Sequence, residues 1–248
     1  MKRMIGRNGA LTGEQAPLAK GRLHQAVAQL LATQIVDGTV PVGHVYPAEV
    51  EHAEQLGVSR SVLREAFQIL TAKGLVTSRP KAGTRVSERR RWSLLDPDVL
   101  GWQIQSGPSE EFLRDLFELR MVVEPQAAEM AALRRSDDQL VDMANALDTM
   151  EHQTLATEKG RAADQRFHGL LMEATHNEMI HALSSSIMAA IAWTTTIKQR
   201  VQQTPRDPMP EHRKLFEEIA ARNARQAQKA MRVLIELALA DMQVVLRR

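Results

Sequence analysis

The 248 residues are 44% hydrophobic and 25% charged, a balance that supports a packed core and excludes a disordered chain. The sequence contains no cysteine, which excludes disulfides and thiolate metal sites, and no apolar run approaches the roughly 18 residues of a membrane span. Residues 1–91 carry 14 Lys and Arg against 7 Asp and Glu, whereas the remaining residues carry 18 against 23. We therefore expect a soluble cytoplasmic protein in which a nucleic-acid-binding module is joined to a second, acidic domain.

Residues 1–18 lack hydrophobic periodicity and contain three basic residues, so we expect a flexible basic arm. From residue 19 to residue 36, apolar residues recur on one helical face and stop before Asp37-Gly38. This pattern predicts a helix that packs behind the elements described next. Together they form a predicted domain over residues 19–88.

Residues 47–86 predict a helix, a tight turn, a second helix and a short hairpin. Gly57 suits the turn because glycine adopts positive φ without strain, and Ser59 is a suitable N-cap for the second helix. Arg60, Ser61 and Arg64 then project from the first turns of that helix, away from its apolar face. Arginine and serine at this position are typical of a helix that reads the major groove of DNA.

The hairpin consists of two short β-prone runs, residues 75–77 and 84–86, joined by a basic turn with Pro80 and Gly83. We interpret it as a wing that presents its basic tip to DNA; an ordinary surface hairpin is the alternative. The candidate DNA contacts of helix and wing are Ser59, Arg60, Ser61, Arg64, Arg79, Lys81, Gly83 and Thr84.

These motifs resemble the GntR family of bacterial winged-helix regulators. The matching runs are Pro-Ala-Glu at 47–49, Gly-Val-Ser-Arg at 57–60, Leu-Arg-Glu-Ala at 63–66 and Gly-Leu-Val at 74–76. The resemblance implies that Arg60, Arg64 and the wing around Gly83 contact double-stranded operator DNA. At Val50 the fatty-acid-responsive member has an arginine that contacts DNA, so that contact does not carry over.

Residues 89–108 are predicted to be a linker, because they combine a triple arginine with Asp96-Pro97-Asp98 and Gly107-Pro108. The triple arginine fits either a phosphate contact or a solvated charge run. Two tryptophans flank an apolar run, so we expect the linker to dock onto a domain. The stretch 92–102 resembles the corresponding segment of a sugar-acid-operon repressor of the same family.

Residues 109–248 are predicted to be helical almost throughout, which indicates an antiparallel all-α bundle behind the winged helix-turn-helix domain. The expected helices cover residues 110–133, 137–152, 162–175, 178–201, 211–222 and 224–247. The chain is thus expected to be mainly α.

Asp164 and His168 are four residues apart, so on one helix they lie about 40° apart on the same face. A carboxylate and an imidazole in this arrangement can share a divalent metal ion, or one can orient the other. His212, at the start of a later helix, is a candidate third member. The alternative is a surface or capping pair.

The motifs around Arg120, Glu124, Asp164, His168 and His212 also resemble the FCD ligand-binding domain of the FadR subfamily. That resemblance implies a divalent metal, held by one Asp and three His, that helps to bind an organic acid. Asp164, His168 and His212 match three of these ligands.

The position of the family's third histidine is Leu234, which cannot coordinate a metal. A weaker ion bound together with a carboxylate ligand and a metal-free polar trio therefore both remain open. Arg120 is the candidate for binding the effector carboxylate, and an ion pair with Glu124 is its alternative.

The sequence therefore predicts a homodimeric, ligand-responsive repressor of a catabolic operon, released by a sugar acid or another small carboxylate. Two alternatives remain. The three polar residues could form a metal-dependent hydrolytic centre, although no nucleophile motif accompanies them, so we expect no enzyme. The bundle could also serve only to dimerise a constitutive DNA-binding protein.

Overall fold

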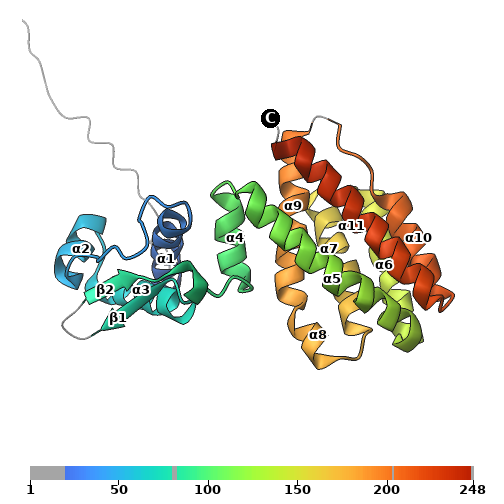
Figure 1. Cartoon of the computed structure of the whole chain (residues 1–248), viewed down its shortest axis with the longest axis horizontal. Coiled ribbons are helices and arrows are strands. Elements are labelled where there is room, and N and C mark those ends of the chain that lie inside the picture. Colours follow the sequence, from blue (N-terminus) through green and yellow to red (C-terminus); the bar gives the residue numbers. More distant parts are fainter. Residues whose placement is uncertain (1–19, 80–82, 203, 247–248) are drawn as a thin grey trace, which may run out of the picture. The chain divides into compact units, whose positions relative to one another are not determined.

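The computed structural model describes residues 20–79, 83–202 and 204–246 and divides the chain into two compact units, residues 1–91 and 92–248 (Figure 1). The division falls inside the segment that was expected to be a linker. The described residues contain no helix that is long and apolar enough to cross a membrane.

The first unit is a winged helix-turn-helix. It contains α1 (Lys20–Val36), α2 (Glu49–Leu56), α3 (Arg60–Ala72), β1 (Val76–Arg79), β2 (Gly83–Val86) and the 3-10 helix η1 (Arg89–Arg91). α1 packs against α3. The turn between α2 and α3 is closed by Gly57, whose φ of 64° is the left-handed conformation that glycine adopts without strain. The predicted fold of this domain is confirmed.

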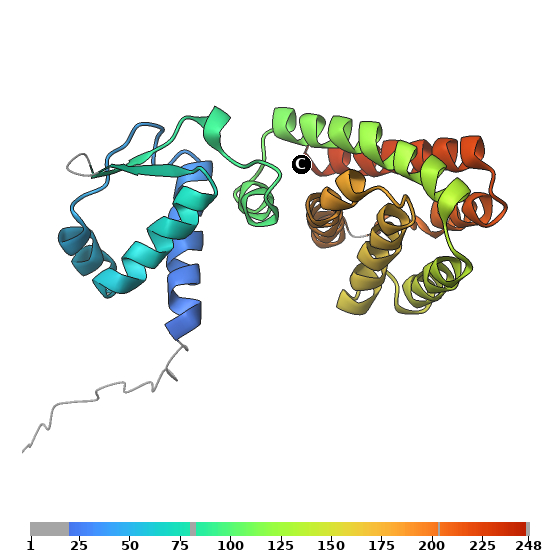
Figure 2. The same cartoon turned by 90° about the horizontal axis from the view of Figure 1, so that it is seen from below.

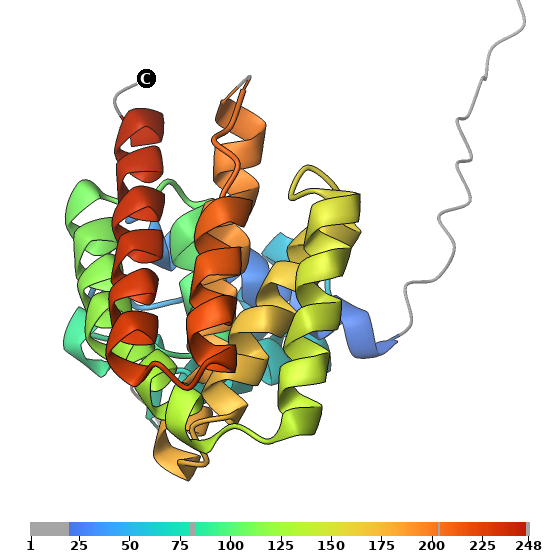
Figure 3. The same ribbon diagram turned by 90° about the vertical axis from the view of Figure 1, so that its right-hand side faces the viewer.

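The second unit contains only helices among its described residues. They are α4 (Pro97–Gln105), α5 (Glu110–Arg134), α6 (Asp137–Gln153), α7 (Glu158–Glu173), α8 (Glu178–Ala182), α9 (Ser184–Val201), α10 (Met209–Ala220) and α11 (Ala224–Leu246). α5 and α11 lie side by side, as do α6 and α7 (Figures 2 and 3). The predicted helical bundle is confirmed.

Two features of the bundle differ from the sequence prediction. The helix expected over residues 178–201 is divided at Leu183, whose N–H bonds to Ile180 O in the three-residue pattern of a 3-10 turn. In addition, residues 97–105 of the expected linker form α4. Leu100 and Ile104 of α4 are buried in a cluster with Phe112, Leu116 and Ala190 of the bundle.

Gly160, in the first turn of α7, permits a close approach of the chain to itself. A Cβ at this position would lie 1.8 Å from the backbone oxygen of Thr154. We therefore expect Gly160→Ala to displace the turn before α7 and to lower the free energy of unfolding by about 1–3 kcal/mol. Urea unfolding measures this change, with Gly169→Ala in the same helix as control, because a Cβ there meets only Met188 Sδ at 3.9 Å. Equal losses in the two variants would contradict the close approach.

Candidate functional site

The predicted DNA-reading residues of α3 are all exposed. Ser59 accepts a hydrogen bond from the N–H of Val62 at 3.3 Å, which makes it the N-cap, and its Oγ lies 3.0 Å from that of Ser61. Arg64 pairs with Glu49 of α2 through a 3.0 Å contact, but its side chain remains 62% exposed. Such an exposed ion pair contributes little free energy, so the guanidinium of Arg64 can leave Glu49 at small cost to bind another partner.

The wing residues that the structure describes are also exposed or half-buried. Arg79 pairs with Gly83 across the hairpin, and Thr84 Oγ1 lies 2.7 Å from Ser78 Oγ. Gly83 has a φ of 76°, so a side chain at this position would be strained. Lys81 lies outside the described residues, as does the expected basic arm over residues 1–18.

Arg64→Ala is expected to weaken binding to operator DNA by about 1–3 kcal/mol if the guanidinium contacts a base. Electrophoretic mobility shift with a DNA fragment selected from random sequence would measure the loss. Arg225→Gln, an exposed arginine of α11, serves as a charge-matched control. Unchanged affinity in Arg64→Ala would remove this residue from the interface.

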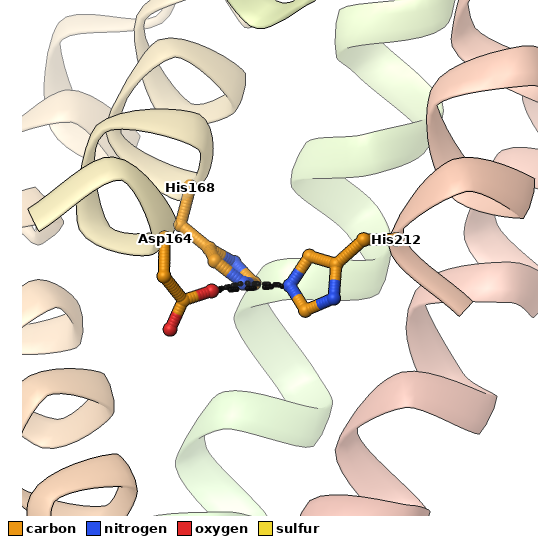
Figure 4. Close-up of side chains that lie close together, drawn as sticks. All are labelled: Asp164, His168 and His212. Atoms are coloured by element: carbon orange, nitrogen blue, oxygen red, sulfur yellow. Dashed lines mark hydrogen bonds and ion pairs between the residues drawn. The ribbon is translucent and has the colours of Figure 1, made fainter. Parts of the chain in front are cut away.

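The structure brings Asp164, His168 and His212 together, although the last is 44 residues from the second (Figure 4). All three side chains are buried, with relative exposures of 3–4%. Asp164 and His168 come from successive turns of α7, and His212 comes from the first turns of α10. Asp164 Oδ1 lies 3.1 Å from His212 Nε2 and 3.7 Å from His168 Nε2, and the two Nε2 atoms are 3.3 Å apart.

The outward nitrogens of both imidazoles face acceptors. His212 Nδ1 lies 2.8 Å from the carbonyl oxygen of Pro208, so Nδ1 carries the proton and Nε2 carries the lone pair. His168 Nδ1 lies 3.2 Å from the carboxylate of Glu124, and the negative charge of that carboxylate favours a proton on Nδ1. Three potential ligand atoms, Asp164 Oδ1 and the two Nε2 atoms, therefore converge on one point.

This arrangement fits a divalent cation. Asp164 Oδ1 is buried and has no hydrogen-bond partner of suitable geometry among the described residues. Metal–ligand distances of about 2.0–2.1 Å imply ligand–ligand separations of about 2.8–3.4 Å in octahedral or tetrahedral sites, close to those observed. One carboxylate and two imidazoles suit zinc and other first-row transition metals. The described residues offer no other such group of three ligands.

Glu124 connects this group to Arg120. Arg120 Nε donates to Glu124 Oε1 at 2.6 Å, and both side chains are buried. Burial alone would raise the pKa of Glu124, but the charge of Arg120 and the adjacent His168 outweigh it and lower the pKa to about 2. The alternative predicted for Arg120, an ion pair with Glu124, is therefore present in the structure.

Asp164 is held ionised in a similar way. Burial alone would raise the pKa of this carboxyl, but the close approach of the His212 and His168 imidazoles and the charge of Arg120 lower it. The sequence linked Arg120 with Glu124 through their i,i+4 spacing. It contained no signal for the contact between Glu124 and His168, because these residues are 44 positions apart.

Comparisons with known proteins agree with this architecture. Residues 23–86 match the model of "Bacterial regulatory proteins, gntR family", and residues 115–237 match the FCD domain. The chain is 31% identical over 208 residues to the galactonate operon transcriptional repressor of Escherichia coli, covering 83% of this chain and 90% of that protein. It is also 33% identical over 161 residues to the Uxu operon transcriptional regulator of E. coli, covering 64% and 61%.

Among solved structures, a regulator from Listeria monocytogenes described as Lar has a TM-score of 0.61 at 19% identity. That match covers 90% of this chain and 97% of the other, and at this identity it supports the fold alone. Because the relatives are regulators, the expectation that this chain is not an enzyme is confirmed. The chain belongs to the GntR family of bacterial transcription regulators and, within it, to the FadR subfamily that carries an FCD domain.

Proposed function

We propose that the protein represses a catabolic operon and is released from its operator when a small carboxylate, such as a sugar acid, binds within the helical domain. The convergence of Asp164, His168 and His212 carries the proposal, because each offers a buried ligand atom to one point and Asp164 Oδ1 has no hydrogen-bond partner there among the described residues. A ligand that supplies or completes this centre would bind one conformation of the domain better than the other, which is the basis of a switch.

The sugar-acid class is supported by the relatives named above, which include a galactonate operon repressor and an Uxu operon regulator. Leu234 supports a role for the effector in completing the site. It is apolar and buried, and the family resemblance places it at the position of a fourth ligand, so the described residues offer three protein ligands to an ion there. The remaining coordination positions would be open to a carboxylate and to water. When bound, the ion would fix and polarise that carboxylate.

Arg120 is proposed to contribute to effector binding as well. Among the described residues it forms one hydrogen bond, from Nε, and its other guanidinium nitrogens are available to an anion. Arg120 would thus neutralise an effector carboxylate next to the ion.

On the DNA side, we propose that Ser59, Arg60, Ser61 and Arg64 contact the major groove and that Arg79, Lys81, Gly83 and Thr84 of the wing contact the backbone or minor groove. A homodimer would place two such units on the half-sites of a palindromic operator. The acid-bound state would then disfavour the spacing that the operator requires.

Thermal melting tests the effector proposal. Chelator-treated protein is melted with a panel of aldonates and dicarboxylates, each with and without Zn²⁺, Ni²⁺ or Mn²⁺. We expect one acid together with one ion to raise the melting temperature more than either alone. The same pair should dissociate the protein from its operator. Stabilisation by an acid without any ion would support the metal-free polar trio instead. Absence of any shift would favour a bundle that only dimerises.

A further inference from the structure

The first unit contains a cleft beside the wing that shares Arg79 and Gly83 with the proposed wing contacts and extends beyond them. Its volume is about 860 Å³, and it lies between the hairpin, the connector before α2 and the 3-10 helix η1. Four arginines line it: Arg79 and Arg85 from the hairpin, and Arg90 and Arg91 from η1. Glu88 is the one carboxylate among the described lining residues.

The strand register places the hairpin arginines on one face. Thr77 pairs with Arg85 and Arg79 pairs with Gly83, so these four residues share a side of the two-stranded sheet. The neighbouring pair, Val76 and Val86, faces the opposite side and is buried, as expected for the face that packs on the helices. The arginines therefore stand on the outer face of the wing.

The cleft is preorganised and carries excess positive charge. Arg85 Nη1 donates to the backbone oxygen of Gly43 at 2.9 Å, which fixes this guanidinium against the connector. Glu88 pairs with Arg90 at 2.6 Å, but the Arg90 side chain is 82% exposed, so the pair is weak. Four arginines thus face one carboxylate, and Arg79 and Arg91 form no ion pair among the described residues.

We propose that this cleft binds a phosphate group of the DNA backbone next to the wing. Clustered guanidinium groups match the geometry and charge of phosphate. Two observations favour DNA, rather than a small molecule, as the source of the phosphate. The lining of the cleft includes Arg79 and Gly83, which lie on either side of the wing tip, and its arginine side chains are exposed, so a long polymer can reach them. The contact extends the DNA interface from α3 and the wing to η1, and it explains the arginines of residues 90–91.

The salt dependence of DNA binding tests this proposal. Wild type, Arg91→Gln and the control Arg225→Gln are titrated with a mixed-sequence DNA duplex at several salt concentrations, and association constants are measured by fluorescence anisotropy. The slope of log K against log[salt] is negative, and each lost phosphate contact should decrease its magnitude by about 0.9. We expect that decrease in Arg91→Gln and in a second variant, Arg90→Gln, and none in Arg225→Gln.

A second experiment uses inorganic pyrophosphate to distinguish DNA phosphate from a free phosphate compound as the ligand of the cleft. If pyrophosphate stabilises the wild type against heat but not Arg91→Gln, and the salt slope is unchanged, the cleft is a small-anion site and the assignment to DNA is wrong. If neither the slope nor the melting temperature changes, the cleft binds no phosphate. The inference rests on DNA binding by the first unit, which the wild-type titration measures separately: no binding by the wild type would contradict that function itself.

Discussion

Replacing Glu124 by glutamine is expected to lower the free energy of unfolding by about 3–5 kcal/mol. Arg120 and Glu124 are both buried and joined by a 2.6 Å contact, and His168 faces the same carboxylate. The substitution retains the shape of the side chain but removes the carboxylate charge that pairs directly with the arginine. Urea unfolding of chelator-treated protein measures the effect, and the exposed Glu118→Gln on α5 provides a matched control.

A double variant separates the charge from the packing. Arg120→Met combined with Glu124→Gln removes both buried charges, so it should recover much of the stability that Glu124→Gln loses. The comparison also requires the single variant Arg120→Met. If the losses of unfolding free energy in the two single variants add up to the loss in the double variant, the two residues act independently and the ion pair contributes little.

The pH dependence of stability offers a further test of the same carboxylate. The pKa of Glu124 is lowered from 4.5 to about 2 in the folded protein, so its contribution is fully present above the unfolded-state pKa and is lost as the pH falls through about 2. We expect the difference in unfolding free energy between wild type and Glu124→Gln to shrink as the pH decreases from about 5 toward 2. A difference that is constant over this range would contradict the lowered pKa.

The DNA-binding unit could be predicted in detail because its signals are local. The turn at Gly57, the cap at Ser59 and the positive φ at Gly83 are each encoded by one residue in a short motif. The helical bundle was predicted for the same reason, through apolar periodicity. The break at Leu183 was missed because neither glycine nor proline marks it, and the residue remains in a right-handed helical conformation.

The candidate site was only partly predictable. Asp164 and His168 share a helix, so their spacing identified them, whereas His212 was a candidate from its place at a helix start and was matched to a ligand only through the resemblance to a family motif. The contacts that orient the site could not be read from the sequence, because the carbonyl of Pro208 leaves no side-chain signal and Glu124 is far from His168 along the chain. Long-range packing, rather than local propensity, determines which polar residues meet.

Replacing Asp164 by asparagine is expected to abolish the stabilisation of the protein by a divalent ion. In the wild type, an ion present at about 100 times its dissociation constant should add about 2.7 kcal/mol to the free energy of unfolding. The asparagine keeps the shape of the side chain but removes the only carboxylate among the three candidate ligands. Loss of one of three protein ligands should cost more than the roughly 10–100-fold in affinity typical of outer-shell changes.

The same variant also tests whether Asp164 stabilises the fold when no metal is present. Asparagine has an N–H₂ group that can donate to His168 Nε2 or His212 Nε2, so it can satisfy the lone pairs that converge in the wild type. Chelator-treated Asp164→Asn should therefore be at least as stable as chelator-treated wild type, while its melting temperature no longer responds to the ion. The exposed Asp142→Asn should retain the full response. If the melting temperature of Asp164→Asn responds to the ion as the wild type does, the ion binds elsewhere. If Asp164→Asn is less stable than wild type without metal, the buried carboxylate stabilises the fold, and the three residues are a structural group rather than a binding site.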